Sequence, residues 1–149
     1  KDVKMAKEIA EINKIQEKIL RKYWPGKYTF VLKCKSQNSN LLPAMLHIAL
    51  QTGKMKAKNQ KLYGVAKDTI ALRIPRYKFL NDLLKKINKP LVQTSVNISG
   101  QKPLVKIKEI KTVFAKNKFV DLIIDAGDLK SKKPSRIIKI SKMGLTRLR

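Results

Sequence analysis

The sequence predicts an α/β fold, a twisted mixed sheet with flanking helices. Segments rich in β-branched and aromatic residues alternate with segments that have the 3.6-residue period of amphipathic helices. The alternation lacks the strict βαβ repetition of a fully parallel sheet. The 149 residues, of which 43% are hydrophobic, are enough for one core and too few for two independent ones. We therefore expect residues 1–149 to form a single domain.

Four stretches have the pattern of helices. The first covers residues 2–22, where Asp2 can serve as the N-cap and Pro25 and Gly26 in the following turn stop the helix. Its expected core side carries Ile9, Ile12, Ile15, Ile19 and Leu20. The other three helices are expected at residues 41–51, 77–87 and 106–116. Their expected inward residues include Phe79, Leu80, Leu83 and Leu84 in the third helix and Ile107, Ile110, Val113 and Phe114 in the fourth.

Strands are expected at residues 28–34, 68–74, 90–94, 122–124, 136–140 and 145–148. Polar or basic loops are expected at 36–40 and 54–61, and a turn at 125–128. The third strand is an apolar run that leads directly into a loop of small polar residues, 95–100. Loops in this position commonly carry ligands, so this loop is a candidate binding segment.

The chain is strongly basic, with 35 Lys and Arg against 10 Asp and Glu and a net charge of +25. Such an excess attracts polyanions, including tRNA, in a salt-dependent way. Only six of these residues are arginines, although planar recognition of phosphate or guanine favours Arg. The lysines are therefore compatible with an RNA-binding face and equally with a biased composition that fills exposed positions. Aromatic residues make up 6% and show no interleaved stacking pattern along the sequence.

Several classes of site are excluded by composition. Cys34 is the only cysteine and His47 the only histidine, which excludes an intrachain disulfide and a zinc site of Cys and His. Neither common Gly-rich phosphate loop is present, and no G-x-S-x-G elbow supports a hydrolase. No stretch reaches the length of a membrane span, and the opening residues do not resemble a secretory signal. We therefore expect a cytoplasmic protein that does not bind a membrane.

Four ordered segments carry a resemblance to a known family. They are WPGKYTFVL (24–32), DTIALRIP (68–75), TSVNISG (94–100) and PSRII (134–138), followed by the closing LTRLR. Their order and spacing are similar to those of the YrdC-like threonylcarbamoyl-AMP synthase family, in which the corresponding forms are W-P-G-P-L-T, T-V-A-V-R-x-P, S-A-N-x-S-G and P-S-T-I-V. The resemblance spans nearly the whole chain.

The resemblance implies a YrdC-like α/β fold around a basic cavity and a nucleotidyltransferase that acts in tRNA modification. Such an enzyme makes L-threonylcarbamoyladenylate and pyrophosphate from L-threonine, bicarbonate and ATP. It implies no permanently bound cofactor, with ATP as a substrate accompanied by Mg²⁺. The chemistry depends on positioning and charge neutralisation, which suits a sequence without a nucleophilic triad.

The resemblance also implies the site residues, although it assigns no catalytic residue. L-Threonine would be bound by Arg73, Ser95 and Ser135, and ATP by Thr69, Asn97 and Arg149. Thr69 and Arg73 occupy alternate positions of one expected strand, so their side chains should face the same way.

Other interpretations of these residues stay open. Arg73 could form a surface salt bridge, and Ser95 and Asn97 could stabilise a turn through Asx and Ser hydrogen bonds. Arg149 could be solvated, while Trp24 and Thr29 fit core and strand positions better than ligand positions.

The sequence departs from the family pattern in several places. The family's N-terminal P-T-D-T strand end, K-x-R pair and S-x-x-N have no counterpart in residues 1–149, and we expect them upstream of Lys1. Val96, Val105, Arg136 and Lys139 stand where the family has Ala, an ATP-contacting Thr, Thr and Asp. The alternative functions are a non-catalytic basic module that binds tRNA or double-stranded RNA, or a subunit that assists a tRNA-modifying protein partner.

Overall fold

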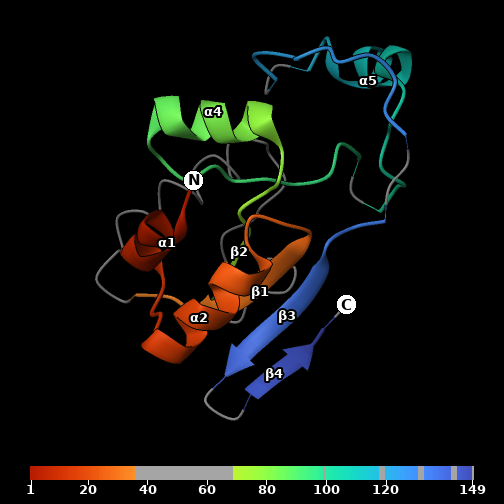
Figure 1. Cartoon of the computed structure of the whole chain (residues 1–149). Coiled ribbons are helices and arrows are strands. Elements are labelled where there is room, and N and C mark those ends of the chain that lie inside the picture. Colours follow the sequence, from red (N-terminus) through yellow and green to blue (C-terminus); the bar gives the residue numbers. More distant parts are fainter. Residues whose placement is uncertain (36–68, 99, 118–119, 131–132, 142–143, 149) are drawn as a thin grey trace. The chain divides into compact units, whose positions relative to one another are not determined.

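The computed structural model describes residues 1–35, 69–98, 100–117, 120–130, 133–141 and 144–148 (Figure 1). The chain divides into two compact units. The first unit comprises Lys1–Leu91 and Ser135–Arg149, and the second unit comprises Val92–Pro134. The helix expected at 41–51 and the loops expected at 36–40 and 54–61 lie outside the described residues.

The first unit contains a four-stranded mixed sheet. Its strands are β1 (Tyr28–Lys33), β2 (Thr69–Leu72), β3 (Arg136–Ser141) and β4 (Gly144–Arg147). The order is β2-β1-β3-β4, with β1 antiparallel to β2, parallel to β3, and β3 antiparallel to β4. Figure 1 shows β3 running alongside β1 although most of the chain separates them. The mixed α/β class and four of the six expected strands are thus confirmed.

The N-terminal helical segment is two helices, α1 (Val3–Ile9) and α2 (Lys14–Tyr23), so the prediction of one helix over residues 2–22 was wrong. The helix breaks because the backbone there pairs with the C-terminal end of β1. Ala10 forms a β-bridge with Cys34, and the Glu11 N–H donates to the Lys33 carbonyl at 2.8 Å. Sheet hydrogen bonds therefore replace helical ones at the break.

Side-chain caps define the starts of both helices. Asp2 caps α1 by accepting a hydrogen bond from the Met5 N–H, as expected. Asn13 and Gln16 form a reciprocal capping box at the start of α2. The new register leaves Ile15 71% exposed, so its expected core position was also wrong.

The next helix is α4 (Lys78–Ile87), close to the expected span 77–87. It ends at Asn88, whose φ of 52° is the left-handed conformation common at helix ends. Leu84 is buried as expected, whereas Phe79 is 46% exposed and does not point inward.

The core of the first unit lies between the sheet and the N-terminal helices. Phe30, Leu20 and Leu32 are fully buried. The core cluster consists of Val3, Ala6, Ala10, Leu20, Trp24, Phe30, Leu32, Ile74 and Ile140. Tyr28, Leu72 and Ile138 pack against it. We call the side of the sheet that faces this core the helix side, and the opposite side the far side.

The second unit contains α5 (Ile107–Phe114), which confirms the helix expected at 106–116. None of the described residues of this unit is buried. The strands expected at 90–94 and 122–124 do not form, and Leu122 is 76% exposed. A strand requires a hydrogen-bonded neighbour, and none of the four described strands pairs with either apolar run.

Candidate functional site

Three polar side chains converge on the far side of the sheet. Thr29 lies between Tyr28 and Phe30, and Arg73 lies between Leu72 and Ile74, all of which contact the core. Because side chains alternate along a strand, Thr29 and Arg73 project to the far side.

A hydrogen bond links β1 to the start of β3 on this side. The hydroxyl oxygens of Thr29 and Ser135 are 2.8 Å apart, although the residues are 106 positions apart in sequence. The parallel pairing of Tyr28 with Arg136 and of Thr29 with Ile137 places the two segments next to each other. Both hydroxyls are half-buried, so each restricts the orientation of the other.

Arg73 is held by the turn that precedes β1. Its Nε donates to the Gly26 carbonyl at 3.0 Å, and the Gly26 N–H donates to the Ile74 carbonyl at 2.9 Å. The antiparallel register pairs Phe30 with Leu72, so the next step places Arg73 opposite Thr29. The side chain is exposed and makes no ion pair with a described residue. This bond restricts the orientation of the guanidinium, a group that can bind a carboxylate through two parallel hydrogen bonds.

Thr69 lies on the far side as well, at the other end of β2, where it pairs with Lys33. Arg73 follows Thr69 by four positions, which corresponds to about 13 Å along an extended chain. The two residues thus share a side of the sheet, as their spacing predicted, and only a ligand of extended shape would contact both.

Ser95 and Asn97 lie in the second unit. The Ser95 hydroxyl donates to the Asn97 side-chain oxygen at 2.5 Å. The Asn97 amide nitrogen donates to the carbonyls of Ile98 and Gln101, each at 2.9 Å. These are the Asx and Ser hydrogen bonds of the turn interpretation. Asn97 therefore holds the loop together, while the Ser95 side chain lies exposed beside it.

Three residues considered in the sequence analysis remain: Arg149, Trp24 and Thr29. Arg149 lies outside the described residues. Trp24 is 6% exposed within the core, as expected for a core residue, and its indole N–H donates to the Tyr28 carbonyl at 2.9 Å. Thr29 is a strand residue as expected, but its bond to Ser135 gives it a role in the site that sequence spacing did not suggest. The only sequence signal was the alternation Tyr28-Thr29-Phe30, which places Thr29 on the side of the strand opposite to the two aromatic residues.

Chemical alternatives find little support in the described structure. Over the described ranges no three His, Cys, Asp or Glu side chains gather as metal ligands. Burial, and secondarily the charge of Glu11, raises the pKa of the Cys34 thiol, so this cysteine is a poor nucleophile. No helix in the described stretches is long and apolar enough to cross a membrane.

Comparison with known proteins identifies the family. The family model named Sua5_yciO_yrdC, described as "Telomere recombination", matches residues 1–149. A Methanocaldococcus jannaschii protein that is provisionally named threonylcarbamoyl-AMP synthase is 34% identical over 140 residues, which is 94% of this chain and 54% of that protein. The threonylcarbamoyl-AMP synthase of Serratia proteamaculans is 28% identical over 103 residues, covering 69% of this chain and 43% of the relative.

Solved structures agree on the fold. E. coli YciO superposes with a TM-score of 0.71 at 23% identity, covering 100% of this chain and 62% of that one. P. abyssi Sua5 complexed with L-threonine gives a TM-score of 0.69 at 22% identity, covering 99% of this chain and 37% of that one. The chain thus spans roughly half the length of the curated relatives it matches. With a family model that matches every residue and a 34%-identical relative, the chain belongs to the Sua5/YciO/YrdC family.

Proposed function

We propose that the protein containing this chain is an L-threonylcarbamoyladenylate synthase that acts in tRNA modification. The family match over residues 1–149 carries the proposal, and the similarity to two relatives named threonylcarbamoyl-AMP synthase supports it. In this proposal residues 1–149 are one YrdC-like domain, and its substrates are L-threonine, bicarbonate and ATP.

The proposed reaction has two steps. The amino group of threonine attacks bicarbonate, forming a carbamate and releasing water. A carbamate oxygen then attacks the α-phosphorus of ATP, and the bond to pyrophosphate breaks. No enzyme nucleophile is consumed, so the protein has to position the reactants and neutralise their charge.

The far side of the sheet supports a threonine subsite. The guanidinium of Arg73 would pair with the threonine carboxylate, since its Nε is fixed by the Gly26 carbonyl and its terminal nitrogens have no ion-pair partner among the described residues. The Ser135 hydroxyl would contact threonine as well, and Thr29 would act as a positioning residue that orients it. Thr69 would lie on the ATP side.

The loop of the second unit carries two further proposed ligand residues. We propose that Ser95 contacts threonine and that Asn97 faces ATP, with the hydrogen bonds of Asn97 fixing the loop shape on which both depend. Arg149 is proposed as a further ATP ligand by family likeness alone. The mixed anhydride product reacts with water, so the assembled site would have to exclude it.

The direct test is pyrophosphate release by the full-length protein. Release should require threonine, bicarbonate and ATP together, and its absence when all three are present would refute the proposal.

Arg73→Ala should lower kcat/KM for threonine about 100-fold, as expected for the loss of a charge-assisted hydrogen bond. Arg147→Ala is a matched control, because Arg147 is exposed like Arg73 and its register with Ile138 places it on the helix side. Equal effects of the two substitutions would exclude a specific role for Arg73.

Thr29→Val tests the positioning role, because it removes the hydroxyl and keeps the shape of the side chain. The threonine KM should rise several-fold while the ATP KM stays unchanged, and Thr29→Ser, which keeps the hydroxyl, should leave the threonine KM close to that of the unsubstituted protein. If Thr29→Val disrupted the fold instead, the affinities for threonine and for ATP and the melting temperature would all fall together.

A further inference from the structure

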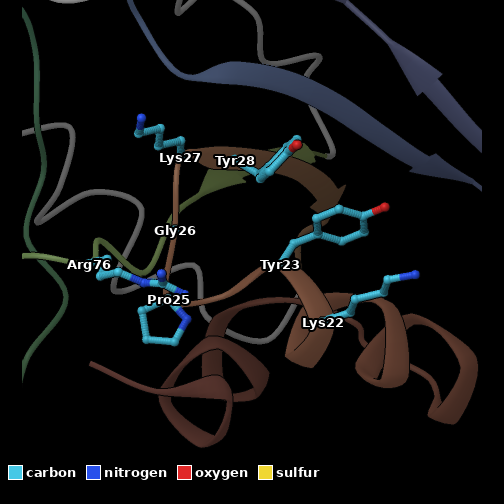
Figure 2. A pocket seen from close by; sticks show the side chains of 7 residues that line it. All are labelled: Lys22, Tyr23, Pro25, Gly26, Lys27, Tyr28 and Arg76. Carbon is cyan, nitrogen blue, oxygen red and sulfur yellow. The ribbon is translucent and has the colours of Figure 1, made fainter.

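The turn at residues 24–26 connects α2 to β1 and contacts Arg73. Figure 2, which is centred on a pocket beside this turn, shows Pro25 and Gly26 running from the end of α2 to the start of β1. Gly26 uses both of its backbone polar groups to bind the segment that follows β2. Its carbonyl accepts from the Arg73 Nε at 3.0 Å, and its N–H donates to the Ile74 carbonyl at 2.9 Å. The position of the turn therefore determines where the Arg73 side chain can point.

The turn is itself fixed by the core. Trp24 is 6% exposed, and its ring packs edge-on against Phe30 with a centroid distance of 5.6 Å. The Trp24 indole N–H donates to the Tyr28 carbonyl at 2.9 Å, and its backbone N–H donates to the Leu20 carbonyl in α2 at 2.8 Å. Movement of the turn would disturb these buried contacts. The Gly26 carbonyl is thus a rigidly placed acceptor.

Residue 26 has to be a glycine for this arrangement. A Cβ at this position would overlap the Tyr23 carbonyl oxygen. That oxygen belongs to the backbone at the last residue of α2, so it cannot rotate away as the end of a flexible side chain could. Glycine permits such a close approach between two backbone segments. Any side chain at residue 26 would push the turn away from α2 and displace the carbonyl that Arg73 uses, and a hydrogen bond weakens steeply when its geometry changes.

We propose that Gly26 is a positioning residue for threonine binding, because the turn at residues 24–26 orients the Arg73 guanidinium before the threonine carboxylate arrives. The identity of this ligand rests on the proposed function. An exposed arginine otherwise loses side-chain freedom when it binds a ligand, and this loss weakens binding. The bond to Gly26 restricts the side chain in advance through Nε, and it leaves the two terminal nitrogens for parallel hydrogen bonds to a carboxylate.

The first test is the threonine kinetics of Gly26→Ala in the full-length protein. The threonine KM should rise about tenfold while the ATP KM stays unchanged, because a misplaced guanidinium weakens only the contact with threonine. Gly144→Ala is the matched control. Its φ of 129° also disfavours a side chain, and β1 and β3 separate β4 from β2. This control should lower the melting temperature and leave the threonine KM unchanged. Equal changes of the threonine KM in both variants would contradict the proposal.

A double-mutant cycle shows whether Gly26 acts through Arg73. When Gly26→Ala is added to Arg73→Ala, kcat/KM for threonine should fall by less than about twofold further, since the side chain that the turn positions is already absent. A further loss of about tenfold would mean that Gly26 affects activity independently of Arg73, which would overturn the proposal.

Exchange of the Arg73 Nε–H with water tests the contact without catalysis. In the full-length protein labelled with ¹⁵N-arginine, the bond to Gly26 should slow this exchange relative to free arginine. Gly26→Ala should accelerate it about tenfold and leave the Nε–H of Arg147, in β4, unchanged. An Arg73 Nε–H that exchanges as fast as free arginine in the unsubstituted protein would overturn the proposal even if Gly26→Ala does not fold. Absence of threonine-dependent pyrophosphate release would refute the proposed function and would leave this measurement valid.

Discussion

The two units of the chain are stabilised in different ways. All of the buried hydrophobic residues that the structure describes belong to the first unit, where helices and sheet enclose Phe30, Leu20 and Leu32. In the second unit polar contacts connect the segments. Asp128 accepts from the Ile107 N–H at the start of α5, and Lys111 pairs with Asp125 at 2.7 Å.

The two units should therefore differ in how easily their structures adjust. Apolar burial stabilises the first unit cooperatively and depends little on salt. Exposed hydrogen bonds and ion pairs contribute little each and respond to pH and ionic strength. The first unit thus offers a fixed surface for Arg73, Thr29 and Ser135, whereas the loop that carries Ser95 and Asn97 belongs to the more adaptable unit.

The largest expected effect is in the core of the first unit. Phe30→Ala should lower the free energy of unfolding by about 3–5 kcal/mol, because it leaves a cavity at a fully buried site. Urea denaturation measures the change. Phe79→Ala is the control, and its 46% exposure predicts a cost below about 1 kcal/mol. Equal losses of unfolding free energy in the two variants would contradict the assignment of Phe30 to the core.

The second effect concerns the binding loop. Asn97→Ala removes an acceptor and two donors, so local opening of the loop should become about 1–3 kcal/mol easier. Hydrogen exchange of the Leu104 N–H, which donates to the Val96 carbonyl, reports this opening. Gln101→Ala serves as the control, because only its backbone carbonyl accepts from Asn97. If the free energy of global unfolding fell by the same amount, the loop would not open independently of the rest of the protein.

The third effect is at the start of α5. Asp128→Ala should destabilise this helix by roughly 0.5–2 kcal/mol, the usual range for a lost N-terminal acceptor. Amide exchange in the first turn of α5 measures it, and Asp121→Ala offers an exposed acidic control. Unchanged exchange in the Asp128 variant would show that water replaces the contact.

The smallest effect depends on pH. Hydrogen bonds from Lys111 and then from the Gly127 N–H lower the pKa of Asp125, so folding favours its ionised form. The resulting stabilisation is present above the unfolded pKa of about 3.9 and is lost as pH falls through the lower folded value. The protection factor for exchange at Gly127, taken relative to the intrinsic rate at each pH, should therefore fall on acidification before that at Phe30 does. Asp125→Asn should remove this difference between the two sites, and molar salt should reduce it.

Sequence patterns predicted the first unit well where local and tertiary forces agree. The strands around Phe30, Ala71 and Ile138 have the expected β-branched and aromatic composition, and they pair with one another. The break at Ala10 was missed because the amphipathic period continues through it. The Asn13-x-x-Gln16 capping box was the signal that could have revealed the second helix.

The second unit was predicted less well because its expected strands depend on partners. The apolar runs at 90–94 and 122–124 have strand-like composition, yet periodicity cannot supply a neighbour for pairing. For the site, alternation correctly placed Thr69 and Arg73 on one side of β2. The contact of Thr29 with Ser135 could not be predicted, since it depends on a register between segments 106 positions apart.

The parallel pairing of β1 with β3 has a consequence for synthesis of the chain. Ile140, which joins the core cluster, is made more than a hundred residues after Phe30, which lies at the centre of the core. Helices α1 and α2 can form early, but their apolar faces lack the contact with β3 until that strand has been made. Contacts this distant in sequence close slowly, so the nascent protein exposes this apolar surface until β3 pairs with β1 and would benefit from a chaperone during that interval.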